Sequence, residues 1–312
     1  MNFREYARDA HDSSKMQPSC HGALTVDLED WKNALNPKPN MKHAEIDESY
    51  IRESTKRILH ILEEFETKAT FFVLGEVALA VPETVKEISR HGHEIGSHSP
   101  AHVPPRNIPR DKYRSLVKRD VELLGRITGQ NIRGFRAPYF AVSRNEGWLL
   151  KMLAEIGFVY DSSVVPSWTP LYGIPNAPKN PYYPDFNDIS KQTPGGPILE
   201  LPVSVWPSWS TLPGLPVGGG FFMRLWPSKL YLQALRGNIR SGHALNLYIH
   251  LADLDQDKMT GDGLALSDRV IQYVGIKKGM RNFSQLLGTV RLGTISEVFS
   301  QQIEAVRNHT GK

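Results

Sequence analysis

Two histidines stand four residues apart in the segment His98-Ser-Pro-Ala-His102. If the segment is helical, both imidazoles lie on one face and can bind a single ion. Two surface histidines in a loop are the simpler interpretation of this spacing alone. A cluster of acids at a neighbouring predicted strand end favours the metal site, since two histidines and one carboxylate leave metal positions open for water and substrate. His91 and His93 are assigned to a turn and a strand instead.

The acids are Asp27, Glu29 and Asp30, and they follow the apolar run that begins at Ala23. On an extended strand Asp27 and Glu29 point to the same side, while Leu28 points to the other. One acid can bind a metal while another acts as a general base on water. A helix N-cap or a surface salt bridge is the alternative, and the buried strand before the acids makes it less favourable.

A further histidine, His250, follows Leu247-Tyr248-Ile249 and would therefore end a buried strand. A histidine at that position suits a general acid that protonates a leaving amine. A structural histidine with satisfied hydrogen bonds explains the same position equally well.

Composition limits the other functions. The chain has 312 residues, a net charge of +4 and one cysteine, Cys20, so an internal disulfide framework and a thiolate metal site are excluded. Lysines and arginines are scattered among acids, which argues against nucleic-acid binding. The apolar runs are too short for a transmembrane helix, and the first twenty residues lack an apolar signal core. We therefore expect a cytoplasmic protein, and the charge is compatible with an acidic glycan or with peripheral membrane contact.

The elements that must position these side chains alternate along the chain. We predict strands at 23–27, 69–74, 93–96, 132–135, 158–160, 198–205, 244–249 and 291–294. We predict helices at 48–65, 82–90, 111–125, 145–156, 228–239, 267–274, 282–287 and 295–306. This alternation predicts an α/β fold with a parallel sheet or barrel, in which functional groups gather at the carboxyl ends of the strands.

Prolines recur between about 165 and 227 and interrupt this rhythm. We interpret that stretch as an insertion of loops with one strand, and Gly218-Gly219-Gly220 as a flexible turn near the site. Because predicted βα units lie on both sides, we expect residues 22–312 to form a single domain with this insertion. Residues 1–21 are expected to be a flexible leader.

Taken together, the motifs resemble the polysaccharide deacetylase family, the NodB-homology carbohydrate esterases of family 4. The resemblance spans about Ala23 to His250, and its second and third motifs are the specific ones. In order, the five motifs are Thr25-Val26-Asp27, His98-Ser-Pro-Ala-His102, Arg136-Ala-Pro-Tyr139, Tyr160-Asp161-Ser-Ser and Leu247-Tyr-Ile-His250. The stretches 172–175 and 215–220 further resemble a subgroup linked to exopolysaccharide and O-antigen gene clusters.

This resemblance implies a distorted (β/α) barrel that hydrolyses the N-acetyl group of an amino sugar with a divalent metal, usually zinc. It implies that Asp27 is the base and that His98, His102 and one acid hold the metal. The substrate would be an amino-sugar-containing glycan or a lipid- or nucleotide-linked sugar.

The same resemblance assigns the remaining roles. The backbone N–H of Tyr139 would stabilise the oxyanion. Arg136 and Asp161 would orient or tune the base and the acid, and His250 would protonate the departing amine.

The chain departs from the family pattern at two places. Leu28 separates Asp27 from the acids that follow, so either Glu29, which shares a strand face with Asp27, or Asp30, which matches in residue type, can be the metal acid. After His250 comes Leu-Ala-Asp253, where the subgroup more often has Pro-Trp. The alternatives are a deformylase or metal-free amidase on a small substrate, and a glycan-binding relative without turnover.

Overall fold

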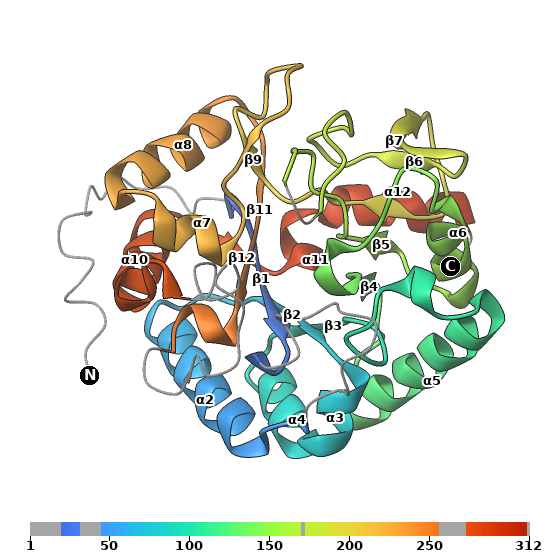
Figure 1. Cartoon of the computed structure of the whole chain (residues 1–312), viewed down its shortest axis with the longest axis horizontal. Helices are drawn as coiled ribbons and strands as arrows, with labels where there is room; N and C mark the ends of the chain where they lie inside the picture. The colour runs from blue at the N-terminus through green and yellow to red at the C-terminus, as the bar shows by residue number, and fades with distance from the viewer. Residues whose placement is uncertain (1–19, 32–44, 170–171, 256–272, 311–312) are drawn as a thin grey trace.

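The computed structural model describes residues 20–31, 45–169, 172–255 and 273–310. Its main sheet consists of eight strands, and every pair of neighbours in it is parallel. These strands are β1 (Gly22–Leu28), β2 (Thr70–Val73), β3 (Glu94–Ser97), β4 (Gly134–Phe135), β5 (Tyr160–Asp161), β8 (Leu199–Glu200), β11 (Leu245–His250) and β12 (Leu292–Gly293). The order is β11-β1-β2-β3-β4-β5-β8, and β12 pairs with β1. The sheet curls into a half-barrel surrounded by helices (Figure 1), which confirms the predicted fold class.

Helices cover the outside of this sheet (Figure 1). They are α2 (Glu48–Glu64), α3 (Gly75–Ala80), α4 (Pro82–Arg90), α5 (Arg110–Thr128), α6 (Gly147–Ile156), α7 (Gly220–Leu225), α8 (Ser228–Arg240), α10 (Ile276–Thr289), α11 (Ile295–Val298) and α12 (Ser300–Thr310). Short 3₁₀ turns occur at η2 (Pro105–Asn107), η3 (Pro138–Phe140) and η4 (Leu251–Asp253). Among the described residues, no helix is both long and apolar enough to cross a membrane.

Local sequence explains where these helices begin and end. The side chain of Asp47 accepts a hydrogen bond from the N–H of Tyr50 and so caps α2, whose apolar side chains at 51, 58 and 62 are buried. Pro82 begins α4, where its missing N–H costs nothing. Gly129 ends α5 in a left-handed conformation at φ 72°, which glycine adopts without a steric penalty.

Two smaller hairpins lie within the proline-rich stretch. One pairs β6 (Tyr183–Asp185) with β7 (Asp188–Thr193), and the other pairs β9 (Val205–Trp206) with β10 (Leu215–Pro216). The N–H of Ser204 donates to the carbonyl of Asn246 (3.0 Å), so the chain after β8 approaches β11 and narrows the open side of the sheet.

Three sequence predictions need correction. The strand expected at 198–205 is two strands in different sheets, β8 and β9, with Pro202 between them, which has no N–H for a continuous ladder. The helix expected at 295–306 is interrupted at Phe299, and the turn there lets side chains of both α11 and α12 pack into one buried cluster. Gly218-Gly219-Gly220 is a closely packed segment and not an open turn, because a Cβ on Gly218 would lie 2.4 Å from Val203 Cγ1.

Two further predictions fall wholly or mainly on residues that are not described: the leader over 1–21 and the helix at 267–274. The stretch 165–227 supplies β8 to the main sheet in addition to its loops and hairpins. The division into one domain with an insertion stays a prediction.

Candidate active site

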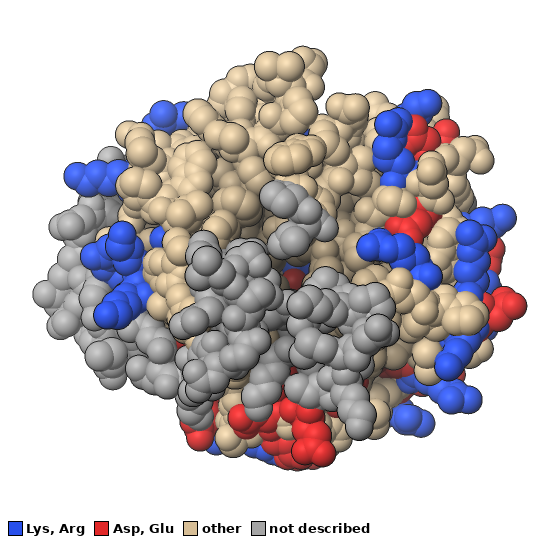
Figure 2. All heavy atoms as spheres, viewed as in Figure 1, with Lys and Arg blue, Asp and Glu red and all other residues tan. Residues whose placement is uncertain are grey.

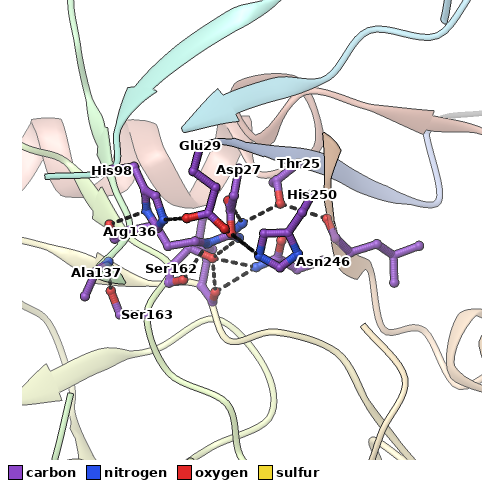
Figure 3. A network of polar contacts seen from close by, with 12 residues as sticks. Thr25, Asp27, Glu29, His98, Arg136, Ala137, Ser162, Ser163, Asn246 and His250 are labelled. Carbon is purple, nitrogen blue, oxygen red and sulfur yellow. Dashed lines mark hydrogen bonds and ion pairs between the residues drawn. The ribbon is translucent and has the colours of Figure 1, made fainter. Parts of the chain in front are cut away.

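Four of the predicted residues, Asp27, Glu29, His98 and His250, come together at the carboxyl end of the main sheet (Figure 3). Asp27 lies near the end of β1, where its register partners are Phe72 on β2 and His250 on β11. Because parallel neighbours end at the same edge, Asp27 and His250 lie side by side although they are far apart in sequence. Nε2 of His250 is 3.8 Å from Oδ2 of Asp27 and 3.3 Å from Oε1 of Glu29.

Glu29, His98 and His102 form a buried group whose ligand atoms all lie within 4.8 Å of one another. Oε2 of Glu29 is 2.6 Å from Nε2 of His102 and 3.6 Å from Nε2 of His98. Burial alone would raise the pKa of Glu29, but the nearby charges of His102 and His250 hold that pKa well below its ordinary value.

The donor set fits a divalent cation. Nδ1 of His98 is 2.9 Å from the carbonyl of Arg136, which can only accept, so Nδ1 carries the hydrogen and Nε2 presents its lone pair toward Glu29. Oε2 of Glu29 is buried and accepts no hydrogen bond of good geometry, despite its closeness to two imidazoles. A buried acceptor without a proton donor beside imidazole nitrogens is the arrangement that a shared cation satisfies.

Asp30 does not belong to this group. Its Oδ2 accepts a hydrogen bond from the N–H of Asp47 (2.6 Å), at the residue that caps α2. The geometry therefore favours Glu29 as the metal acid, as its shared strand face with Asp27 suggested. His93, which the sequence assigned to a strand, accepts from the N–H of Ala69 through Nδ1 and is structural.

Arg136 holds Asp27 in place. Its Nη1 donates to Oδ1 of Asp27 (2.7 Å) and to the hydroxyl of Thr25 (2.7 Å), and its Nε and Nη2 donate to the carbonyl and hydroxyl of Ser162. Arg136 is completely buried, and Asp27 is 1% exposed. A buried pair of this kind is favourable only when the remaining polar groups are also hydrogen-bonded, and Nε, Nη1 and Nη2 of Arg136 each donate to a partner here.

His250 is fixed by the acid three residues after it. Oδ2 of Asp253 accepts from the N–H of His250 (2.9 Å) and lies 3.4 Å from its Nδ1, while Nε of Arg224 on α7 donates to Oδ1 (2.8 Å). Burial opposes protonation of His250, but the hydrogen bond to Asp253 and the charges of Glu29, Asp253 and Asp27 raise its pKa to about 9. A cation bound by Glu29 would offset part of that negative charge.

Tyr139 lies beside the group Glu29, His98 and His102, and its ring centroid is 4.0 Å from that of His102. Its backbone is left-handed, at φ 58° and ψ 15°, which is uncommon for a residue with a Cβ. A hydrogen bond holds the start of the turn at Pro138–Phe140, because the N–H of Ala137 donates to the hydroxyl of Ser163 (2.8 Å; Figure 3).

Asp161 contacts Ser163 and, within the described part of the chain, is hydrogen-bonded to neither Asp27 nor His250. Its carboxylate accepts from the N–H and hydroxyl of Ser163, and it lies near the carboxyl group of Glu200 on β8. Both carboxyls are fully buried, and burial followed by their mutual repulsion raises the pKa of Glu200 well above its ordinary range.

Sequence reasoning did not assign roles to Asp253, Arg224, Ser162 or Asn246. Asp253 was visible only as a departure from a familiar pattern. Asn246 bonds to the Ser162 hydroxyl (2.9 Å; Figure 3) and to the carbonyl of Leu201 (2.8 Å), so it links β11 to the strands on the far side of the sheet. A polar residue inside a buried strand is the one signal that could have indicated it.

Two family profiles match consecutive parts of the chain. Residues 36–159 match the polysaccharide deacetylase family, and residues 162–300 match a domain of unknown function. A peptidoglycan-N-acetylglucosamine deacetylase of Bacillus cereus is 36% identical over 107 residues, which cover 34% of this chain and 38% of that protein. The chain spans about two fifths of the length of the curated relatives that it matches first.

Solved structures share the fold over nearly the whole chain. A crystal structure described as a polysaccharide deacetylase of Mycobacterium smegmatis aligns with 96% of this chain and 95% of its own at 23% identity, with a TM-score of 0.56. PuuE allantoinase aligns with 93% of this chain and 90% of its own at 15% identity and a TM-score of 0.54. At these identities the likeness shows the fold alone.

Proposed function

We propose that this chain is a metal-dependent amidohydrolase that removes the N-acetyl group of an amino sugar, because residues 36–159 match the polysaccharide deacetylase family. The observation that carries the proposal is the placement of Asp27 and His250 beside the group Glu29, His98 and His102. A base, an acid and a cation site within reach of one another are the parts that amide hydrolysis needs.

In this proposal Glu29, His98 and His102 hold the metal, which we propose to be zinc because two imidazoles and one carboxylate suit that ion. A bound cation supplies Lewis acidity toward the amide carbonyl and favours deprotonation of water.

Asp27 acts as the general base. Arg136 engages Oδ1 through Nη1, so Oδ2, which faces His250, is the oxygen that takes the proton from the attacking water. The fixed Arg136 also keeps the carboxylate from rotating, which preserves the geometry needed for proton transfer.

His250 acts as the general acid. Asp253 binds the Nδ1 side of the ring and orients Nε2 toward Glu29 and Asp27, where the leaving nitrogen would arrive. A proton held on Nε2 can then pass to the departing amine as the carbon–nitrogen bond breaks.

Tyr139 contributes its backbone N–H to the developing oxyanion. Its left-handed conformation is the observation behind this role, because a sparsely populated backbone geometry beside His102 is retained where it has a function. Asp161 acts one step further away by fixing Ser163, which in turn holds the N–H of Ala137 at the start of the same turn.

The substrate that we propose is an amino-sugar-containing surface polysaccharide or its lipid- or nucleotide-linked precursor. The name of the Bacillus cereus relative, a deacetylase of N-acetylglucosamine in peptidoglycan, supports an amino sugar as the substrate class. The link to exopolysaccharide or O-antigen synthesis and the cytoplasmic location remain predictions, and cell fractionation with an antibody to the chain checks the location.

The test is acetate release from N-acetylglucosamine oligosaccharides and from peptidoglycan fragments by zinc-supplemented protein. We expect acetate in amounts equal to the free amines formed, and none from the Asp27→Asn variant. Formate release, or activity that is unchanged by chelation and readdition of zinc, would favour the deformylase or the metal-free amidase. Zinc binding without acetate from any substrate of the panel would contradict turnover.

A further inference from the structure

Large apolar side chains are exposed on one part of the surface. Seven large hydrophobic residues are exposed in the described part of the chain, and six of them fall between 168 and 230. We call these six the Trp–Leu patch: Trp168, Trp209, Leu212, Leu215, Leu225 and Leu230. Trp168 and Leu212 are the most exposed of the six, at 74% and 71%. Exposed apolar side chains that gather in this way mark an interaction surface more often than scattered ones do.

The β9–β10 hairpin carries half of this patch, and its loop is held by hydrogen bonds from a lysine. Nζ of Lys179 donates to the carbonyls of Pro207 (2.9 Å), Ser210 (2.7 Å) and Leu212 (2.6 Å). Three carbonyls of the loop between β9 and β10 therefore accept hydrogen bonds from one lysine, so the apolar side chains of this loop are exposed on a backbone that is hydrogen-bonded to the rest of the protein.

Neighbouring elements extend the same surface. The hydroxyl of Ser167, next to Trp168, donates to the carbonyl of Gly214 (2.6 Å). On the other side, the N–H of Ser208 donates to the side chain of Asn238 on α8 (3.1 Å), and the ring of Trp209 lies close to Gly237. The hairpin, the segment around Trp168 and helix α8 are thus in contact, and α7, which ends at Leu225, directly precedes α8 in the chain.

The charges of this region all have one sign. From Leu201 to Ala252 the sequence contains no aspartate or glutamate, while α8 carries the exposed basic residues Lys229, Arg236 and Arg240. Figure 2 shows blue spheres without red ones over α8, and uncharged atoms over the β9 hairpin at the top of the view. Acidic residues elsewhere in the chain nearly balance the basic ones, so their absence here is local.

We propose that the Trp–Leu patch and the basic residues of α8 dock this protein onto an anionic phospholipid surface. Tryptophan and leucine insert at the boundary between headgroups and acyl chains, and lysine and arginine beside them attract anionic headgroups. The missing acids remove the repulsion that such a surface would otherwise exert.

Charge also favours an anionic membrane over the two main alternatives, a neutral glycan and a second copy of this chain. A neutral glycan gains little from three cationic side chains. In a two-fold pair of chains the same face meets itself, so α8 would place like charges near like charges. An anionic membrane complements both the apolar and the basic side chains. None of the patch residues belongs to the candidate active site, so the inference is independent of the proposed reaction.

Vesicle co-sedimentation of the full chain tests the proposal, with vesicles of phosphatidylcholine alone and of phosphatidylcholine mixed with phosphatidylglycerol. We expect binding to the mixed vesicles that weakens as salt is raised. Trp209→Ser/Leu212→Ser should lower the partition coefficient by at least about tenfold, because two buried apolar side chains are lost. Leu79→Ser is the matched control, since Leu79 is 70% exposed on α3, outside the patch, and it should bind as the wild type does.

The basic residues are tested separately. Each cation near an anionic surface contributes a factor of about five, so Lys229→Gln/Arg236→Gln should lower binding to mixed vesicles about thirtyfold. Lys118→Gln/Arg119→Gln on α5 removes the same charge elsewhere and should have a much smaller effect. Thermal unfolding of every variant verifies that it is folded.

Several results would overturn the proposal. One is that the wild type binds neither kind of vesicle. Another is that the patch variants and their control variants lose vesicle binding to the same extent. Light scattering that shows a dimer which Trp209→Ser/Leu212→Ser converts to monomers, without vesicle binding, would assign the patch to self-association. Pull-down by insoluble chitin that Trp209→Ser/Leu212→Ser abolishes, without vesicle binding by the wild type, would assign the patch to glycan.

Discussion

Replacing Arg136 with leucine should lower the free energy of unfolding by about 3–5 kcal/mol, because it leaves the buried carboxylate of Asp27 without its partner. Arg136 is fully buried, and its guanidinium donates to Asp27, Thr25 and Ser162. Leucine supplies none of these donors, so the penalty reflects both an unpaired charge and unsatisfied acceptors.

Urea unfolding followed by tryptophan fluorescence measures this loss. The matched control is Arg144→Leu, which removes an arginine whose Nη2 lies 2.8 Å from Oδ2 of Asp188 at the surface. Because water solvates both groups there, we expect little change in stability. The double variant Asp27→Leu/Arg136→Leu should recover part of the loss, since removing both partners of a buried pair leaves no isolated charge.

If Arg136→Leu and Arg144→Leu destabilise the protein equally, burial of the ion pair does not determine its energetic role, and the reasoning is refuted. A double variant that loses the sum of the two single losses would also contradict it, because the two side chains would then be energetically independent.

Three further outcomes are expected. Asp27→Asn should abolish acetate release while zinc binding persists, as measured by assay and metal analysis of the same sample; retained activity would remove Asp27 as the base. Glu29→Gln should weaken zinc binding by more than Asp30→Asn does in a chelator competition, because only Glu29 lies with the two histidines, and the reverse order would assign the metal to Asp30. Burial raises the pKa of Asp120 from 3.8 to about 7, so between these pH values the folded state keeps a proton that the unfolded state has lost. The free energy of unfolding should therefore fall by about 4 kcal/mol as the pH rises from about 4 to about 7. Asp120→Asn should flatten that part of the stability profile in urea unfolding, and an unchanged slope would show that Asp120 is not its source.

The βα alternation predicted most of the fold, since helices such as α4 and α8 and strands such as β1 have strong apolar periods and clear ends. Positions where tertiary contacts override local pattern were not predictable. Gly220, the first residue of α7, packs so closely against Asp253 that a Cβ would lie 2.1 Å from its carboxylate, and no local signal indicates that contact.

The candidate site could be predicted where residue type alone carries the chemistry. Asp27, Glu29, His98 and His102 stand together as expected from the strand ends, although the segment from His98 to His102 is a bend and not the helix that the histidine spacing assumed. Sequence could not choose between Glu29 and Asp30 with certainty, because the choice depends on the direction of the chain after β1 and on the N–H of Asp47.

Supporting residues were the hardest to predict. Arg224 and Asp253 meet only after the chain has crossed the proline-rich stretch and β11, and both are buried. Their sequence neighbourhood is consistent with ordinary surface charges. Burial, which decides their role, becomes visible only in the folded chain.

The claim at the centre of this account is that Glu29, His98 and His102 bind one divalent metal beside Asp27. Calorimetric titration of zinc into chelator-treated protein tests it most directly, with His98→Ala/His102→Ala as the comparison. One high-affinity site per chain in the wild type, absent from the variant, is the predicted result. Equal zinc binding by both proteins, or none by the wild type, would contradict the claim.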